Sequence, residues 1–160
     1  MITFGELNEN DIIDYGGIIA RVRIEKNVML NPSFRIMTDD GTYKPQFVFD
    51  DYIKGIELTE EILEANGFKR GEDISEEEPY DLDEDGNAYY HLGDDYGIDV
   101  PHLWGWYKDG ILTFPTNFAS WIHVRYVHEL QRLMRTVGLV DEANKFKVEN
   151  KWIKNGDNRA

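Results

Sequence analysis

The chain has 160 residues, of which 31 are acidic and 17 basic, so its formal net charge is −14. This length is typical of one domain, and its 41% apolar and 13% aromatic residues are enough to build a core. Because there is no cysteine, disulfides, zinc–thiolate sites and cysteine nucleophiles are excluded, and a cytoplasmic location is expected. The net acidity predicts no direct nucleic-acid binding and no membrane binding, since phosphate backbones and anionic lipids would be repelled.

The N-terminal third has the pattern of short β-strands. Asp11–Tyr15 and Ile18–Ile24 flank Gly16-Gly17, a dipeptide typical of a two-residue hairpin turn. Further strands are predicted at Val28–Leu30, Phe34–Met37 and Phe47–Tyr52. These short strands predict an antiparallel sheet that is curled or closed into a small barrel.

A short helix is predicted over Thr59–Asn66. Thr59 is a suitable N-cap, and Glu60 and Glu61 favour the positive end of the helix dipole. Gly67 is a suitable C′ residue, and the following Phe68 can fold back onto the helix. The helix is too short to persist alone, so it is expected to pack on the sheet.

The negative charge is concentrated between Glu57 and Asp99, where 16 acidic and two basic residues sum to −14. The rest of the chain is neutral. Three interpretations of this segment are open: a solvated loop, a surface for an unknown protein partner such as a basic protein, or a mimic of nucleic acid. The candidate interaction surface consists of Glu76, Glu77, Glu78, Asp81, Asp83, Glu84 and Asp85.

The densest part of this segment contains half of a calcium-binding pattern. Asp81, Asp83 and Asp85, followed by Gly86, match the first half of a D-x-D-x-D-G loop, so these three carboxylates are weak candidate metal ligands. The position of the final bidentate glutamate holds Leu92 instead. A plain hairpin turn is the competing interpretation, and no cofactor is predicted.

An aromatic β-meander is predicted after the acidic segment. Its expected strands are Asn87–Leu92, Gly97–Val100, Leu103–Tyr107, Ile111–Phe114 and Trp121–Val124. In a strand, Trp104 and Trp106 share one face and Tyr107 lies on the other. The candidate ligand-binding residues are Trp104, Trp106, Tyr107, His91 and His102. The competing interpretation is that these aromatic rings only fill a core beneath a helix.

The C-terminal region predicts an amphipathic helix over Tyr126–Val137, ended by Gly138 and packed on the sheet. Phe146–Val148 is a candidate edge strand, and residues 155–160 are expected to fray.

Two segments resemble a known group of short proteins. Residues 56–68, IELTEEILEANGF, are similar to a pattern I-P-L-T-E-E-x-L-x-x-x-G-F, and residues 126–133, YVHELQRL, are similar to Y-V-H-Q-L-Q-N-L. Both patterns occur in uncharacterised proteins of gut anaerobes and their prophages. This chain departs from them at Glu57, Glu129 and Arg132, where the group has Pro, Gln and Asn. The resemblance implies a shared fold and a phage or mobile-element origin, and it implies no activity.

Taken together, the sequence predicts a compact α+β domain over residues 1–160, with possible sub-lobes at 1–57 and 58–150. Serine-nucleophile, P-loop and dinucleotide-binding motifs are absent, so no catalytic residue is predicted and a non-enzymatic protein is favoured. The leading hypothesis is a binding or accessory protein with an acidic surface. The alternatives are a nucleic-acid mimic and a small-ligand or sugar-binding module, or an enzyme, that uses the aromatic cluster near Trp104 and Trp106.

Overall fold

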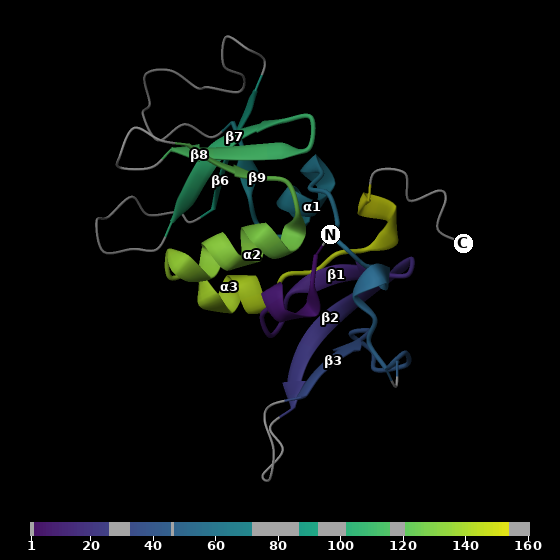
Figure 1. The fold of residues 1–160 in the computed structure, drawn as a ribbon. Coiled ribbons are helices and arrows are strands. Elements are labelled where there is room, and N and C mark those ends of the chain that lie inside the picture. The colour runs from purple at the N-terminus through teal and green to yellow at the C-terminus, as the bar shows by residue number, and fades with distance from the viewer. Residues whose placement is uncertain are drawn as a thin grey trace.

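A computed structural model describes residues 2–25, 33–45, 47–71, 87–92, 102–115 and 121–153. The fold is α+β, with two antiparallel sheets and few helices, and the helices α2 and α3 lie between the sheets (Figure 1). The strands expected at Val28–Leu30 and Gly97–Val100 lie outside the described residues. The same is true of the turn at Asp85-Gly86 and of the C-terminal residues 155–160.

The first sheet contains β1 (Ile12–Tyr15), β2 (Ile18–Glu25), β3 (Ser33–Met37) and β4 (Ile53–Lys54), in the order β3-β2-β1-β4. The β1–β2 hairpin turns at Gly16-Gly17, whose φ angles of 59° and 94° suit glycine, and this prediction is confirmed. The described strands form an open sheet with β3 and β4 at its edges, so the barrel alternative is wrong.

The predicted strand at Phe47–Tyr52 is also wrong. This stretch is an irregular segment followed by a 3₁₀ turn, η2 (Asp50–Tyr52), and only the next two residues pair with β1. The hydroxyl of Tyr15 donates to the carbonyl of Phe47 at 3.4 Å and accepts from the N–H of Phe49 at 3.1 Å. A side chain therefore satisfies backbone groups that a neighbouring strand would otherwise pair.

The helix α1 (Glu60–Ala65) forms as predicted. The Thr59 hydroxyl accepts from the N–H of Ile62 at 3.2 Å, which caps the helix. At the other end the N–H of Phe68 donates to the carbonyl of Leu63 at 3.1 Å, and Gly67 has a φ of 89°. Both Ile62 and Leu63 are buried, so packing supports this short helix.

The second sheet keeps the order of the sequence. It contains β5 (Lys69–Arg70), β6 (Ala88–Leu92), β7 (Leu103–Lys108), β8 (Ile111–Pro115) and β9 (Trp121–Val124). Lys108 pairs with Ile111, and Asp109 and Gly110 both have positive φ, so these two residues form the tight turn between β7 and β8.

The C-terminal part contains α2 (Val127–Thr136), α3 (Val140–Asn144) and the 3₁₀ turn η3 (Asn150–Trp152), and a further 3₁₀ turn, η1 (Phe4–Glu6), lies near the N-terminus. Glu129 accepts from the N–H of Tyr126 at 3.0 Å and so caps α2. Phe146–Val148 is not a strand, and this expectation is wrong. Among the described residues no helix combines the length and apolarity needed to span a bilayer.

The larger hydrophobic core joins the second sheet to α1, α2 and α3. Its fully buried members include Tyr90, Leu112, Leu130, Met134 and Phe146. A smaller core lies within the first sheet, around Ile13, Val22 and Ile36. The core of the second sheet lies on one of its faces. On the other face the side chains of β7, β8 and β9 reach solvent, whereas those of β6 are buried.

Candidate functional site

Three of the four tryptophans of the chain lie on the same face of the second sheet. Because side chains alternate along a strand, the core positions Leu103, Leu112 and Val124 direct their neighbours to the opposite face. The opposite face carries Trp104 and Trp106 from β7, Thr113 from β8, and Trp121 and His123 from β9. We call these five residues the tryptophan face.

Strand register aligns these residues in cross-strand rows. Trp106 pairs with Thr113, which pairs with His123, so these three positions form one row across β7, β8 and β9. The Thr113 hydroxyl and His123 Nδ1 are 3.1 Å apart, within hydrogen-bonding distance. In the neighbouring row Trp121 pairs with Pro115. The face therefore combines indole rings with a hydrogen-bonding pair.

Tyr89 of β6 lies on the same side of the sheet and packs beside the indole rings. Its ring centroid lies 5.2 Å from that of Trp106 and 6.1 Å from that of Trp104. The Tyr89 side chain is buried, whereas both tryptophans are half-buried and Trp121 is 54% exposed. The outer rings are therefore held in place by a buried ring and still reach solvent, as a stacking surface requires.

The predicted ligand-binding residues are only partly brought together. His91 is the cross-strand partner of Trp104, and its ring lies 5.9 Å from the Tyr89 ring, but His91 is buried. His102 immediately precedes β7. Tyr107 lies on the other face, where its hydroxyl donates to the carbonyl of Leu58 at 3.1 Å. Burial there raises the pKa of Tyr107. Its position on the core side of the sheet separates it from the tryptophans.

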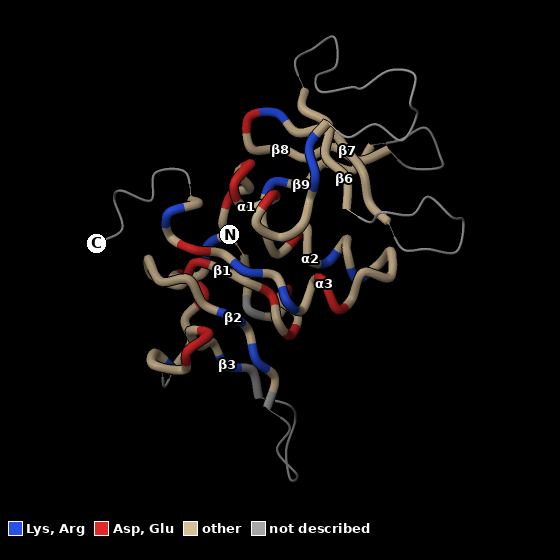
Figure 2. Tube along the Cα trace, turned by 180° about the vertical axis from the view of Figure 1, so that it is seen from behind, with Lys and Arg blue, Asp and Glu red and all other residues tan. Residues whose placement is uncertain are grey.

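The predicted acidic surface and calcium ligands, residues 76–85, lie outside the described residues. Lys, Arg, Asp and Glu are interspersed along the described chain (Figure 2). The described residues include 18 acidic and 14 basic ones, so they account for −4 of the net charge of −14. Within this part of the chain no three His, Asp or Glu residues are grouped as metal ligands would be.

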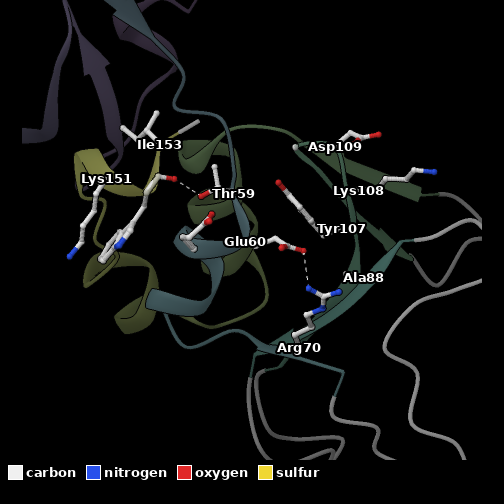
Figure 3. Close-up of a pocket in the computed structure, with 12 residues that line it drawn as sticks. Thr59, Glu60, Arg70, Ala88, Tyr107, Lys108, Asp109, Lys151 and Ile153 are labelled. Atoms are coloured by element: carbon white, nitrogen blue, oxygen red, sulfur yellow. Dashed lines mark hydrogen bonds and ion pairs between the residues drawn. The ribbon is translucent and has the colours of Figure 1, made fainter. Parts of the chain in front are cut away.

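An open groove of about 550 Å³ lies on the other side of the second sheet, between the start of α1, the β7–β8 turn and η3 (Figure 3). Side chains of both charges line it, including Glu60, Arg70, Lys108, Asp109 and Lys151. Of the predicted site residues, it includes only Tyr107.

Several polar groups that line this groove already bind one another or neighbouring backbone groups. The Thr59 hydroxyl donates to the carbonyl of Trp152 at 2.6 Å, and Arg70 pairs with Glu60 at 3.3 Å (Figure 3). The Tyr107 hydroxyl is used by Leu58. These groups attach α1 to the second sheet and to η3, so we assign this groove a structural role and take the tryptophan face as the candidate site.

Sequence reasoning alone did not identify Tyr89, Thr113, Trp121 and His123 as members of the site. Each belongs to a different strand from Trp104 and Trp106, and only the register between strands aligns them. The signal that could have found them is the alternation of each strand, which separates Trp121 and His123 from Val124.

Comparison of the chain with protein-family models, with curated proteins and with solved structures finds no match.

Proposed function

We propose that the protein is a non-enzymatic binding protein whose tryptophan face takes up an uncharged, ring-shaped ligand, and that this ligand is a saccharide. The observation that carries the proposal is the gathering of Trp104, Trp106 and Trp121 on the sheet face opposite the core. Solvent-reaching tryptophans supported by a buried ring are costly to keep on a surface without a partner, and such patches are typical of binding sites.

The chemistry of the face suits a sugar. The C–H faces of a pyranose ring are apolar and stack on indole rings, while its hydroxyls need donors and acceptors. Thr113 and His123 lie in the same row as Trp106 and share one hydrogen bond, and the hydroxyl and the imidazole each have capacity for a further one. β7 and β9 are two strand spacings apart, about 10 Å, which allows two neighbouring sugar rings to stack at once.

Charge favours an uncharged ligand over a nucleic acid. Aromatic residues on a sheet also stack on bases in single-stranded RNA and DNA. Such proteins add a positively charged track for the phosphates. This chain has a net charge of −14, and none of the five residues of the tryptophan face is basic. Lys69 of β5 lies in the same cross-strand row as His91 and Trp104, but one lysine does not make a continuous positive track. A face that stacks on rings but does not neutralise phosphates suits a neutral sugar better than a nucleic acid.

The test is a panel of neutral oligosaccharides on a glycan array, followed by calorimetric titration of the ligands that bind. Trp121→Ala is the preferred variant, because an exposed side chain can be removed without disturbing the core. Phe49→Ala is the matched control, since Phe49 is 56% exposed but belongs to the first sheet region. We expect Trp121→Ala to weaken binding about tenfold, equivalent to ~1.4 kcal/mol, and the control to leave it unchanged.

Two results would reject the saccharide proposal. One is that no neutral oligosaccharide binds at millimolar concentration. The other is that the Trp121→Ala and Phe49→Ala variants bind equally well, because the affinity would then not come from the tryptophan face.

A basic protein partner for the acidic segment is the second candidate function. The distribution of charge favours it, because −10 of the net charge of −14 belongs to residues outside the described part of the chain. A nucleic-acid mimic is the more specific version of this proposal, and a cytoplasmic location and a phage or mobile-element origin remain part of it. The test is affinity capture with the wild type and with a variant whose carboxylates at 72–85 are neutralised. Unchanged partners would reject the acidic segment as a binding surface.

A further inference from the structure

A second set of exposed aromatic side chains lies beside the first sheet, far from the tryptophan face in the sequence. Phe47, Phe49 and Tyr52 are 68%, 56% and 54% exposed, and Asp50 and Asp51 lie between the second and third ring. We call these five residues the aromatic–acidic patch. Large apolar side chains are rarely gathered in this way on a monomer surface unless a partner covers them.

The core of the first sheet holds this patch in place. The buried Tyr15 contacts it three times, through hydrogen bonds with the backbone of Phe47 and Phe49 and through an edge-to-face contact with the Tyr52 ring at 5.8 Å. The Tyr52 carbonyl accepts from the N–H of Gly16 at 2.9 Å. The backbone that carries these rings is therefore fixed to the first sheet, and the rings stay exposed because of how it is fixed.

The rings also contact one another. Phe49 and Tyr52 meet edge to face, with centroids 6.0 Å apart, while the intervening turn η2 presents Asp50 and Asp51 to solvent. An anchored aromatic cluster loses little conformational entropy when a partner binds. Residues of this kind provide most of the binding energy in protein interfaces.

The carboxylates indicate the kind of partner. Between Lys44 and Lys54 the chain carries two acids and no base, so the patch combines aromatic faces with negative charge. Lysine and arginine side chains are recognised by this pair of features, through cation–π contacts and through ion pairs with carboxylates. In a symmetric dimer a second copy of the chain would place its own Asp50 and Asp51 against this patch, and the like charges disfavour that contact.

We propose that the aromatic–acidic patch is a docking surface for a lysine- or arginine-rich segment of another protein. The aliphatic and cationic parts of the basic side chains cover Phe47, Phe49 and Tyr52. Their charges pair with Asp51 and add to the interactions that Asp50 already makes within the chain. This inference is independent of the saccharide proposal, because the two surfaces share no residue.

Selection from a random twelve-residue peptide library displayed on phage tests the proposal without knowledge of the natural partner. The wild-type protein is the bait, and the Phe47→Ala/Phe49→Ala double variant is used to remove peptides that bind elsewhere, including those attracted to residues 72–86. Both phenylalanines are exposed, so the variant is expected to fold. We expect the remaining peptides to be enriched in Lys and Arg relative to the input library.

Synthetic versions of the selected peptides then give affinities by fluorescence anisotropy. We expect the double variant to weaken binding at least tenfold, and Asp50→Asn/Asp51→Asn to weaken it severalfold and reduce its salt dependence. Glu60→Gln/Glu61→Gln removes the same charge from α1 and is the matched control, expected to bind as the wild type does.

Three results would overturn the proposal. The selected peptides could show no excess of basic residues, or the control on α1 could weaken binding as much as the change at Asp50 and Asp51. The third is a dimer in sedimentation velocity that the Phe47→Ala/Phe49→Ala change dissociates, because the patch would then bind a second copy of the chain.

Discussion

The side-chain carbonyl oxygen of Gln131 accepts a hydrogen bond of 2.8 Å from the backbone N–H of Ile12, and this pair joins α2 to the first sheet. The amide nitrogen of Gln131 donates to the carbonyls of Asn10 at 2.7 Å and Ala143 at 3.0 Å. A fully buried amide therefore satisfies three backbone groups from two parts of the chain, residues 10–12 and Ala143. These three hydrogen bonds give Gln131 a structural role.

Replacement of Gln131 by alanine is expected to lower the free energy of unfolding by about 3 kcal/mol, because it leaves buried backbone groups without partners. Denaturant unfolding measures this change. Thr136→Ala is the control, since Thr136 is exposed on the same helix and its loss is expected to cost less than ~0.5 kcal/mol. Equal effects of the two changes would contradict a special role for the buried amide.

Gly105→Ala is expected to destabilise the second sheet. A Cβ atom on Gly105 would lie 2.6 Å from the carbonyl oxygen of Thr113 and 2.9 Å from Cδ1 of Phe114. Because the nearest atom belongs to the backbone of β8, the strands would have to separate, at a cost of about 1–3 kcal/mol. Gly5→Ala is the matched change, with no atom within 4 Å of the added Cβ, and thermal unfolding of both variants makes the comparison. A Gly105→Ala protein as stable as the wild type would show that β7 and β8 are not so close.

Acid is expected to destabilise the fold through His128. Burial lowers the pKa of His128 below its ordinary value of 6.5 and outweighs the attraction of Asp11 and Glu129 for the protonated ring. Below pH 6.5 the unfolded chain takes up a proton on His128 that the folded chain excludes. The free energy of unfolding therefore decreases as the pH is lowered, until the pKa of the folded state is reached. The slope attributable to this histidine is at most ~1.4 kcal/mol per pH unit.

Urea unfolding of the wild type and of His128→Leu between pH 5 and pH 8 isolates this contribution. The difference in unfolding free energy between the two proteins is expected to be constant above pH 6.5 and to change in favour of the variant below it. A difference that is independent of pH over the whole range would rule out the buried neutral state of His128.

Tyr89 is expected to determine the order of the tryptophan face. Tyr89→Ala removes the ring that contacts both Trp104 and Trp106, at a cost of about 3 kcal/mol. Tyr89→Phe keeps the ring and is expected to retain most of the stability and any saccharide affinity. The indole N–H resonances of the two tryptophans, recorded by NMR, should shift strongly in the alanine variant only. If the phenylalanine variant behaved like the alanine variant, the hydroxyl and not the ring would be the important group.

Local chemistry was sufficient to predict much of the secondary structure. The cap at Thr59, the glycine at 67 and the turn at Gly16-Gly17 each depend on neighbouring residues, and each is found as predicted. The helix α3 was not predicted, because its five residues bury only Ala143 and show no apolar period. The strand predicted at Phe47–Tyr52 failed because its structure depends on Tyr15, more than thirty residues away.

The candidate site, too, could be predicted only in part from local sequence patterns. The alternation of β7 was enough to set Trp104 and Trp106 on one face and Tyr107 on the other. The addition of Trp121 and His123 depends on pairing between β8 and β9, which no local pattern specifies.

The concentration of tryptophans on one surface also has a spectroscopic consequence. Because Trp104, Trp106 and Trp121 are three of the four indoles in the chain, most of the tryptophans that can report on ligand binding by fluorescence belong to the candidate site itself. The fourth tryptophan, Trp152, is packed against the larger core, and its emission can be removed by exchange for phenylalanine. Candidate ligands can therefore be screened by their effect on the tryptophan emission of the unlabelled protein.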